Sequence, residues 1–396
     1  MKKIKAIKII TTIMLSLFTI VALGYPIAVY SNIPFIEKWR NIYIETAMTT
    51  FHHQWLATSF IPRDVINDVM NKSVKENEKL QDFTVVWENI AYAQDDDIQA
   101  DIVEEEIISK EEEFFSKFWE LDTEDFRNFL TENPEFLEND YDNILINNSK
   151  YKYDIKTVLG ERIYLLDSKN NLLIVEVTGD GYVGKLAIVK DSNQVRLVKS
   201  KTFGSYGTLL RDFYTENDAL LTVNCSGFAD QDFKGNGGIV QGSFVLDGED
   251  LGKPKSSYFL FGMKQDDRFY IEKVDECDVT EYKWAAQFRP ALVINGEKVV
   301  NGTFGFGIQP RTAIGQTLDG EMLLLIVDGR QIGYSLGATV SDLADIMLNH
   351  KAYQAVNADG GSSSLMWYDG KNITKPSSTN YLGRYLPNAI VVDYAK

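Results

Sequence analysis

The segment Asn357-Ala-Asp-Gly-Gly-Ser-Ser-Ser-Leu365 places one acid, two glycines and three hydroxyls directly after an apolar run. Glycines allow a sharp turn and let the backbone come close to a ligand. Successive backbone N–H groups in such a turn form an anion-binding concavity. Asp359 stands where the expected strand ends, a common place for catalytic groups. Taken alone, the segment is also typical of an ordinary glycine-rich hairpin turn.

Other polar clusters also follow expected strands. They are Asn224-Cys-Ser-Gly-Phe228, Pro310-Arg-Thr-Ala-Ile-Gly315, Val327-Asp-Gly-Arg330 and, in a later loop, Arg384. Each has an ordinary structural explanation: Asn224 can cap a turn, Arg311 can lie at a sheet edge, and Asp328-Gly329 is a hairpin signal.

The set as a whole indicates chemistry on a phosphorylated sugar. Arg311 and Arg330 match phosphate oxygens in bidentate fashion, and the glycine–serine turn adds N–H donors. Carboxylates such as Asp328 and Asp359 suit proton transfer or stabilisation of a positive sugar centre. Phosphate-binding and carboxylate groups together predict a substrate that holds both a phosphate and a sugar.

Parts of the sequence also fit two other kinds of site. Asp230, Asp232 and Asn236 are closely spaced oxygen ligands that could hold calcium, although their loop lacks the terminal glutamate of an EF-hand. A serine hydrolase would use Ser362, Ser363 or Ser364 with His350 as base, but the chain has no Gly-x-Ser-x-Gly elbow. With three histidines in the chain, a His-rich zinc site is not expected.

The distribution of charge and the apolar N-terminal run limit the classes of protein to which the chain can belong. Most of the net charge of −17 lies in an acidic segment between Gln94 and Asp142, and no basic stripe indicates nucleic acid. Four lysines precede the apolar run Ile9–Tyr30, which is long enough to cross a bilayer of about 30 Å. The basic flank predicts a single-pass anchor with everything after it outside the cytoplasm. The alternative is a cleaved signal peptide that ends near Ala22-Leu-Gly24.

The expected organisation has five parts. They are a basic tail (1–8), the anchor (9–30), a juxtamembrane helical segment (31–93), an acidic helical spacer (94–149) and a domain at 150–396. The juxtamembrane segment could lie on the bilayer, pack on the main domain or form a stalk. The acidic spacer contains an apolar stripe from Phe114 to Leu121, at helical spacing.

The last domain is rich in short strand patterns from Tyr151 onward, with helices expected near Gly207–Tyr214 and at Val340–Asn349, the latter with Ser341 as N-cap. This pattern predicts an α+β domain with a mixed or antiparallel sheet and few helices. If the protein is exported, Cys225 and Cys277 could form a disulfide.

From about Lys185 to Tyr394 the chain resembles the phosphodiester glycosidase family. The resemblance rests on five ordered motifs: Asn224–Phe228 with Gly235-Asn-Gly-Gly238, Arg289-Pro-Ala-Leu-Val-Ile-Asn-Gly296, Pro310–Gly315, Asp328-Gly-Arg330, and Asn357–Leu365. Two departures stand out. The family often has Asn-Gly-Gly-Phe at the first motif, and Ser362 replaces its third consecutive glycine. If position 362 needs a positive φ, this serine costs stability or reshapes the pocket.

The resemblance implies hydrolysis of a sugar-1-phosphodiester, typically of α-N-acetylglucosamine-1-phosphate, without a required cofactor. The substrate would be a cell-surface glycan, a glycolipid or an exopolysaccharide. The catalytic set would be Asp359 as base or nucleophile, Asp328 as second carboxylate, and Arg311 and Arg330 on the phosphate. Substrate contacts would come from Asn224, Gly227, Gly360, Gly361, Ser362, Ser363 and Arg384. The alternative is a non-catalytic glycan-binding or exopolysaccharide-assembly protein at the cell surface.

Overall fold

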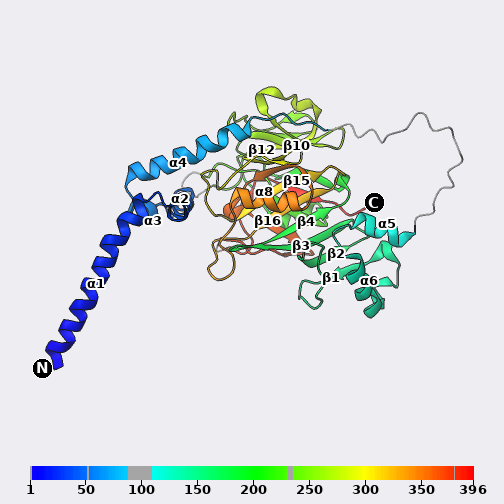
Figure 1. Cartoon of the computed structure of the whole chain (residues 1–396). Helices are drawn as coiled ribbons and strands as arrows, with labels where there is room; N and C mark the ends of the chain where they lie inside the picture. Colours follow the sequence, from blue (N-terminus) through cyan, green and yellow to red (C-terminus); the bar gives the residue numbers. More distant parts are fainter. Residues whose placement is uncertain (1, 51–52, 88–108, 231–234, 379) are drawn as a thin grey trace, which may run out of the picture. The chain divides into compact units, whose positions relative to one another are not determined.

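The structure, a computed structural model, describes residues 2–50, 53–87, 109–230, 235–378 and 380–396 (Figure 1). The chain divides into two compact units. Unit 1 is Met1–Lys79 with the short loop Thr303–Ile308, and unit 2 is Leu80–Gly302 with Gln309–Lys396.

Unit 1 is helical. Its helices are α1 (Lys2–Tyr30), α2 (Pro34–Thr49), α3 (Gln54–Thr58) and α4 (Arg63–Glu78). Pro34 opens α2 at a position where a missing backbone N–H costs nothing. A small apolar core that includes Val29, Ile44 and Val69 joins α1, α2 and α4.

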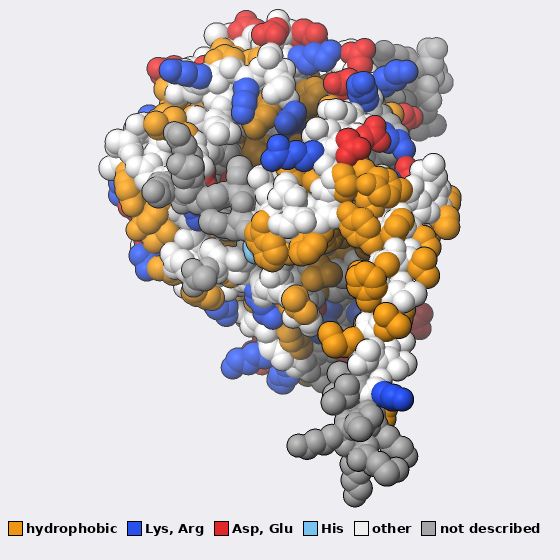
Figure 2. All heavy atoms as spheres, turned by 90° about the vertical axis from the view of Figure 1, so that its left-hand side faces the viewer, with side chains coloured by type: hydrophobic (Ala, Val, Ile, Leu, Met, Phe, Trp, Pro, Cys, Tyr) orange, Lys and Arg blue, Asp and Glu red, His pale blue; other side chains and the backbone are white. Residues whose placement is uncertain are grey.

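Helix α1 is long and apolar enough over Thr11–Tyr30 to cross a membrane, and most of the side chains in this span are exposed, with Val29 as a buried exception. Met14, Leu15 and Phe18, for example, are each about two-thirds exposed. In Figure 2, orange hydrophobic side chains follow one another along the part of α1 that is not drawn in grey. Length and composition fit both an anchor and a signal sequence.

Unit 2 is built mainly from strands. Its helices are α5 (Lys110–Lys117), α6 (Thr123–Glu132), α7 (Leu210–Glu216) and α8 (Val340–Asn349). Its strands are β1 (Leu145–Asn147), β2 (Arg162–Asp167), β3 (Leu172–Gly179), β4 (Tyr182–Val189), β5 (Val195–Lys199), β6 (Thr208–Leu209), β7 (Leu221–Asn224), β8 (Phe244–Leu246), β9 (Glu249–Asp250), β10 (Phe259–Lys264), β11 (Phe269–Lys273), β12 (Tyr282–Phe288), β13 (Ala291–Ile294), β14 (Glu297–Lys298), β15 (Arg311–Thr317), β16 (Met322–Val327), β17 (Ala352–Ala358), β18 (Met366–Tyr368), β19 (Lys371–Asn372), β20 (Tyr385–Leu386) and β21 (Asn388–Val392).

The strands form one large sheet and smaller ones. The nine-stranded sheet runs β1-β2-β3-β4-β16-β15-β17-β13-β14, and two five-stranded sheets run β11-β10-β12-β8-β9 and β19-β18-β7-β21-β5. The remaining sheet pairs β20 with β6. Every described pairing in the large sheet is antiparallel. The predicted α+β fold is therefore confirmed.

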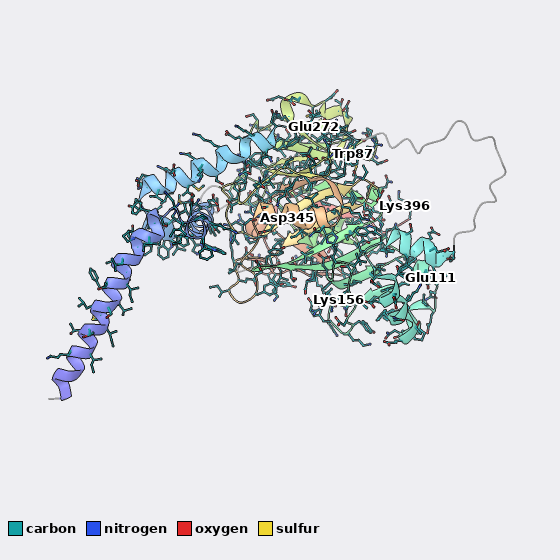
Figure 3. The ribbon with its side chains drawn as sticks, in the orientation of Figure 1. Trp87, Glu111, Lys156, Glu272, Asp345 and Lys396 are labelled. Atoms are coloured by element: carbon teal, nitrogen blue, oxygen red, sulfur yellow. The ribbon has the colours of Figure 1, made fainter. Side chains whose placement is uncertain are left out.

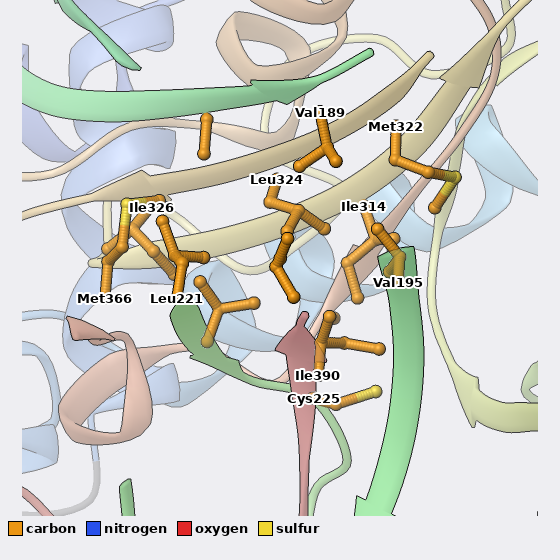
Figure 4. Close-up of a cluster of buried hydrophobic side chains, with 14 of the residues drawn as sticks. Val189, Val195, Leu221, Cys225, Ile314, Met322, Leu324, Ile326, Met366 and Ile390 are labelled. Atoms are coloured by element: carbon orange, nitrogen blue, oxygen red, sulfur yellow. The ribbon is translucent and has the colours of Figure 1, made fainter. Parts of the chain in front are cut away.

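The core of unit 2 lies where the large sheet meets the smaller sheets. Side chains such as Leu324 of β16 and Ile314 of β15 pack with Leu221 of β7 and Ile390 of β21 (Figure 4). Central strands of the large sheet are apolar along their whole length, as β16 is from Met322 to Val327, because both of their faces are covered. This packing fixes the ends of β15, β16 and β17, where the candidate site lies.

The acidic segment was predicted to be a separate helical spacer, and its described part is not separate. Its described part, from residue 109 to 149, belongs to unit 2. Strand β1 pairs with β2, and the buried Lys190 ammonium lies 2.7 Å from carboxylate oxygens of both Glu120 and Glu321. The expected boundary at residue 150 therefore does not divide two structural units. The apolar stripe around Phe118 is buried in the core and is not exposed to solvent. Residues 94–108 lie outside the described residues.

The segment before the acidic stretch also joins unit 2. The Gln81 side chain donates to the carbonyls of Ala291 and Val299, and Trp87 lies against Tyr353 with ring centroids 5.0 Å apart. Figure 3 labels Trp87, and also Glu111 at the start of α5. The end of the predicted juxtamembrane segment, from Leu80, is thus part of the main fold.

Three local expectations need correction. Helix α7 begins at Leu210, because the preceding Thr208 and Leu209 form strand β6. The N-cap of α8 is Thr339 and not Ser341, since the hydroxyl of Thr339 accepts from the N–H of Asp342 in a capping box. Cys225 and Cys277 are free thiols, so they do not form the disulfide that export would have allowed.

Candidate active site

Three strand ends meet at the edge of the large sheet. In the register of β15, Arg311 lies opposite Val327 of β16, and Thr312 lies opposite Ala358 of β17. The residues that follow those partners are Asp328 and Asp359. Neighbouring strands are about 4.8 Å apart, so the sheet itself brings these three predicted residues together.

Two glycines let the loops after β16 and β17 close on the start of β15. A Cβ atom at Gly329 would lie 2.8 Å from the nitrogen of Pro310, and one at Gly360 would lie 2.8 Å from the Pro310 carbonyl oxygen. No larger residue fits at these distances without moving the backbone. The glycines of the third and fifth motifs therefore have a packing reason, which is to hold three polar loops side by side.

Arg330 lies across the glycine–serine turn. Its Nε and Nη2 donate to Oε1 of Gln309 at 3.0 and 2.7 Å. A Cβ at Gly361 would lie 3.4 Å from Nη2 of Arg330, so the guanidinium covers the turn. Burial lowers the pKa of Arg330. Among the described residues, no carboxylate lies within ion-pair distance of this guanidinium, which leaves its charge available for an anion.

Arg311 is buried beside it. Only 6% of the residue is exposed, and its Nε donates to the carbonyl of Ala338 at 3.1 Å. Burial, and after it the positive charge of Arg330, lower the pKa of Arg311 to about 9, while Asp342 acts in the opposite direction. Two guanidinium groups that repel each other, the buried Arg311 and the exposed Arg330, are stabilised by an anion bound between or beside them.

Asp359 is fixed in place by hydrogen bonds of its backbone, so its carboxyl group is not needed to hold the turn. Its N–H donates to the Cys225 carbonyl at 3.0 Å, and its own carbonyl accepts from Nδ2 of Asn224 at 2.6 Å. Burial raises the pKa of the Asp359 carboxyl to about 7, against the opposing effects of a Ser363 hydrogen bond and the Arg384 charge. Near neutral pH this carboxyl can therefore take or release a proton.

Asn224 positions Asp359 and does not reach the site itself. The side chain is fully buried, and its Oδ1 accepts from the Thr312 hydroxyl at 3.0 Å and from the N–H of Leu365 at 3.1 Å. All of its hydrogen bonds thus go to protein groups around the turn. These bonds give Asn224 a positioning role, and its predicted contact with substrate stays a prediction.

Asp328 is similarly occupied by the protein. Its two carboxylate oxygens accept from the Tyr334 hydroxyl at 2.9 Å and from the N–H of Lys375 at 2.8 Å. The residue is 3% exposed, and burial raises the pKa of its carboxyl to about 6. Asp328 therefore ties two loops to the end of β16, which leaves Asp359 as the carboxyl group better placed for chemistry.

The turn after Asp359 accommodates the unusual serine. Gly361 has φ of +64°, whereas Ser362 is not among the residues with a positive φ. The glycine that the backbone needs is therefore present, and Ser362 costs no backbone strain. Ser363 hydrogen-bonds the Asp359 carboxyl, and Ser364 lies 3.2 Å from the Thr312 hydroxyl, oxygen to oxygen.

One wall beside Asp359 is aromatic and basic. A Cβ at Gly227 would lie 3.0 Å from the ring of Phe288 and 3.7 Å from Oδ1 of Asp359, so Phe288 lies near the carboxyl. Phe288 is half-buried, whereas Gly227 is buried. Arg384 covers the ring of Phe228 at 5.0 Å and pairs with Asp230 at 3.0 Å.

The structure bears differently on the predicted calcium site and on the predicted serine hydrolase. Asp230 pairs with Arg384, and the Asn236 side chain bonds to Ser205 and Gly238, while Asp232 lies outside the described residues; the calcium site stays a prediction. The serine hydrolase is excluded by geometry. His350 is buried against Glu161 at the far end of β17, seven residues of extended chain away from Ser362, so it cannot serve as its base.

Two residues of the site were missed by sequence reasoning, Gln309 and Phe288. Gln309 precedes the Pro310 motif directly, and Phe288 precedes the Arg289 motif directly, so each stands one position outside a quoted motif. A cavity of about 480 Å³ that includes Val195, Leu246 and Trp284 in its lining contains no residue of the strand-end site.

The geometry defines a class of site: an anion-binding arginine pair and one titratable carboxyl group at the end of an antiparallel sheet. Residues 217–393 match the model of the phosphodiester glycosidase family. This part of the chain, which begins just after α7 and extends to just after β21, therefore matches the family that the five motifs indicated.

Other similarities are narrower. The SPbeta prophage-derived uncharacterized protein YomE of Bacillus subtilis is 40% identical over 68 residues, which are 17% of this chain and 10% of that protein. The zebrafish N-acetylglucosamine-1-phosphodiester alpha-N-acetylglucosaminidase catalytic domain, auto-inhibited by its pro-peptide, matches 57% of this chain and 83% of its own, with 19% identity and a TM-score of 0.46. A hypothetical protein from Synechocystis matches 59% of this chain and 64% of its own, with 12% identity and a TM-score of 0.48.

Proposed function

We propose that the protein hydrolyses a sugar-1-phosphodiester of the N-acetylglucosamine-1-phosphate type, on a glycan or glycolipid outside the cytoplasm. One observation carries the proposal: the buried Arg311, the exposed Arg330 and a glycine–serine turn lie together beside a carboxyl group whose pKa is about 7. The membrane-compatible helix α1 and its lysine-rich flank support the location.

The reaction breaks the bond between the anomeric carbon and the phosphate oxygen. The electron pair of that bond leaves with the phosphate, whose growing negative charge Arg311 and Arg330 stabilise. A water molecule supplies the oxygen that bonds to the anomeric carbon, and Asp359 takes its proton. A near-neutral pKa favours the role of general base over that of nucleophile. The products are a free sugar and a phosphomonoester.

The defining experiment follows the oxygen of water. The full-length protein is incubated in ¹⁸O-labelled water with a methyl phosphodiester of α-N-acetylglucosamine-1-phosphate, and the products are analysed by mass spectrometry. We expect the label in the sugar and none in the methyl phosphate. Label in the phosphate would show cleavage at phosphorus and contradict the mechanism, and binding without turnover would favour the glycan-binding alternative.

The kcat/KM of the hydrolysis should rise with pH up to about 7 and should not fall above it. Asp359 must be ionised to accept a proton, and burial holds its pKa near 7. We expect kcat/KM to rise about tenfold per pH unit below this value and to level above it. The check is a profile of kcat/KM from pH 4.5 to 9. A rate that is constant or falls as the pH rises from 5 to 7 would exclude Asp359 as the base.

Phe288 should contribute to sugar binding. Its half-buried ring lies near the Asp359 carboxyl, where a pyranose ring would stand during attack on its anomeric carbon. Phe288→Ala should raise KM about tenfold with a smaller change in kcat, since it removes an apolar face and leaves the reacting groups. Phe288→Tyr, which keeps the ring, is the matched control and should stay near wild type. Equal kinetics for the alanine variant and wild type would remove Phe288 from the site.

A further inference from the structure

The loop that follows β16 presents two aliphatic side chains to solvent. It covers residues 329–337 of unit 2 and turns at Gly333, which has φ of +82°. Ile332, beside that glycine, is 97% exposed, and Leu336 on the returning arm is 50% exposed. Ile332 and Leu336 together form the hairpin tip. Single exposed aliphatic side chains are common on protein surfaces, so the meaning of this pair depends on what surrounds it.

Hydrogen bonds hold this loop in one shape. Gln331 and Ser335 exchange two backbone hydrogen bonds, of 2.8 and 3.0 Å. The Ser335 hydroxyl donates to the Asp328 carbonyl at 2.6 Å, and the N–H of Leu336 donates to the Gly181 carbonyl at 2.7 Å. The hairpin tip is therefore presented on a fixed scaffold. A ligand that covered it would remove apolar surface from water without first having to order the loop.

Two cationic side chains stand beside the hairpin tip. Arg330, two residues before Ile332, is exposed, and its Nη2 lies 3.4 Å from the position of a Cβ at Gly361. Lys375 is also exposed, and its ammonium lies 3.4 Å from the centroid of the Tyr334 ring in the same loop. Aliphatic side chains next to cations suit a ligand that has an anionic head and an apolar chain.

The phosphorus of a phosphodiester carries two ester groups, and the site separates them. In the proposed reaction the sugar lies beside Asp359 and Phe288, and the phosphate lies at Arg311 and Arg330. Beyond Arg330 the chain continues directly into the hairpin tip. Two residues of extended chain span at most about 7 Å, so an alkyl chain of a few carbons on that phosphate can reach the tip.

We propose that the hairpin tip binds the alcohol on the far side of the phosphate, and that this alcohol is an aliphatic chain. Of the two substrate classes, glycan and glycolipid, the natural substrate is then a sugar-1-phosphate ester of a lipid. The inference rests on the proposed function for the position of the phosphate and the sugar. The tip takes no part in bond breaking, and its contribution is the burial of apolar surface.

The test compares binding of hexyl phosphate and methyl phosphate to the full-length protein by calorimetry. Both probes are soluble and share one head group, so the ratio of their dissociation constants measures the subsite for the chain. Wild type should bind hexyl phosphate about tenfold more tightly, roughly the gain from burying two methylene groups. Ile332→Ser and Leu336→Ser should each lower this preference about threefold, and the double variant should abolish it.

Two control variants isolate the apolar surface of the tip. Ile332→Leu keeps an aliphatic side chain and should retain the preference for hexyl phosphate. Leu318→Ser is the distant control, because Leu318 is an exposed residue that follows the last residue of β15, at the opposite end of that strand from Arg311. Any binding of the chain to detergent is common to all variants and cancels in the comparison. Thermal unfolding of each variant shows that the fold is retained.

Equal affinity for the two probes in wild type, or a preference that survives in both serine variants, would overturn the inference. Turnover of the methyl phosphodiester separates this outcome from failure of the proposed function. If that substrate is hydrolysed and the hexyl preference is absent, the reaction stands and the lipid substrate is rejected. If the preference follows the tip variants and no phosphodiester is hydrolysed, the lipid subsite stands and the reaction is rejected.

Discussion

Asp359→Asn should lose roughly 10²- to 10⁴-fold in kcat, which is the usual contribution of a positioned general base. The reason is geometric as well as electrostatic. Asn224 and Cys225 hold the backbone of Asp359, so the substitution leaves the turn in place and removes only the ability to take a proton. The measurement is release of N-acetylglucosamine from the methyl phosphodiester at pH 8.

The same substitution should stabilise the protein at high pH. Because the folded-state pKa of Asp359 is near 7 and the ordinary value is 3.8, the carboxyl favours folding most when neutral. That contribution is full below about pH 4 and is lost as the pH rises through 7. Asp359→Asn should thus gain up to about 4 kcal/mol in the free energy of unfolding at pH 8, with the gain disappearing toward pH 4.

The control for both measurements is Asp180→Asn, the same change in an exposed turn. It should alter neither activity nor stability by a measurable amount. If Asp359→Asn lost activity together with stability at pH 8, the effect would be structural, and the assignment of a base would fail. Loss of activity with a gain in stability is what a carboxyl kept for catalysis predicts.

The sequence indicated the family, and it named the residues of the candidate site, because they stand in motifs. Asp328 and Asp359 end apolar strands, and alternation and glycine turns mark those ends without any structure. What the motifs could not give is the direction in which each side chain points. Asp328 and Asp359 stand in similar sequence contexts. In the structure, however, both carboxylate oxygens of Asp328 accept hydrogen bonds from Tyr334 and Lys375, whereas Asp359 makes no such pair of bonds.

The domain boundary failed for a different physical reason. A segment as acidic as 94–142 reads as a solvated spacer, since charge usually lies on the surface. Here its described aromatic residues, such as Phe114 and Phe118, are buried, and Glu120 pairs with Lys190 of β4's following turn. The composition of a segment combines both faces of a helix. A short amphipathic helix with one apolar side therefore cannot be distinguished by composition from a fully solvated charged helix. Only long-range pairing, such as β1 with β2, reveals that the segment is part of the fold.

Arg330→Gln should lower kcat/KM by roughly 10²- to 10³-fold, the size of effect seen when one preorganised donor to a developing negative charge is removed. Glutamine keeps a polar side chain near Gln309 but carries no charge and cannot span Gln309 and a phosphate together. Inorganic phosphate should bind correspondingly less tightly. The pH at which the rate levels should stay near 7, because burial, Ser363 and Arg384 have the largest effects on the pKa of Asp359.

Arg330→Lys separates charge from shape. Lysine restores the positive charge but not the planar fork that bonds Gln309 with two nitrogens, so part of the loss should remain. Arg162→Gln, the same change in an exposed arginine, is the control and should behave as wild type. If Arg330→Gln lowered kcat/KM while phosphate bound as in wild type, the arginine would act on the sugar or on the fold. The assignment of the pair Arg311 and Arg330 to phosphate depends on the two losses appearing together.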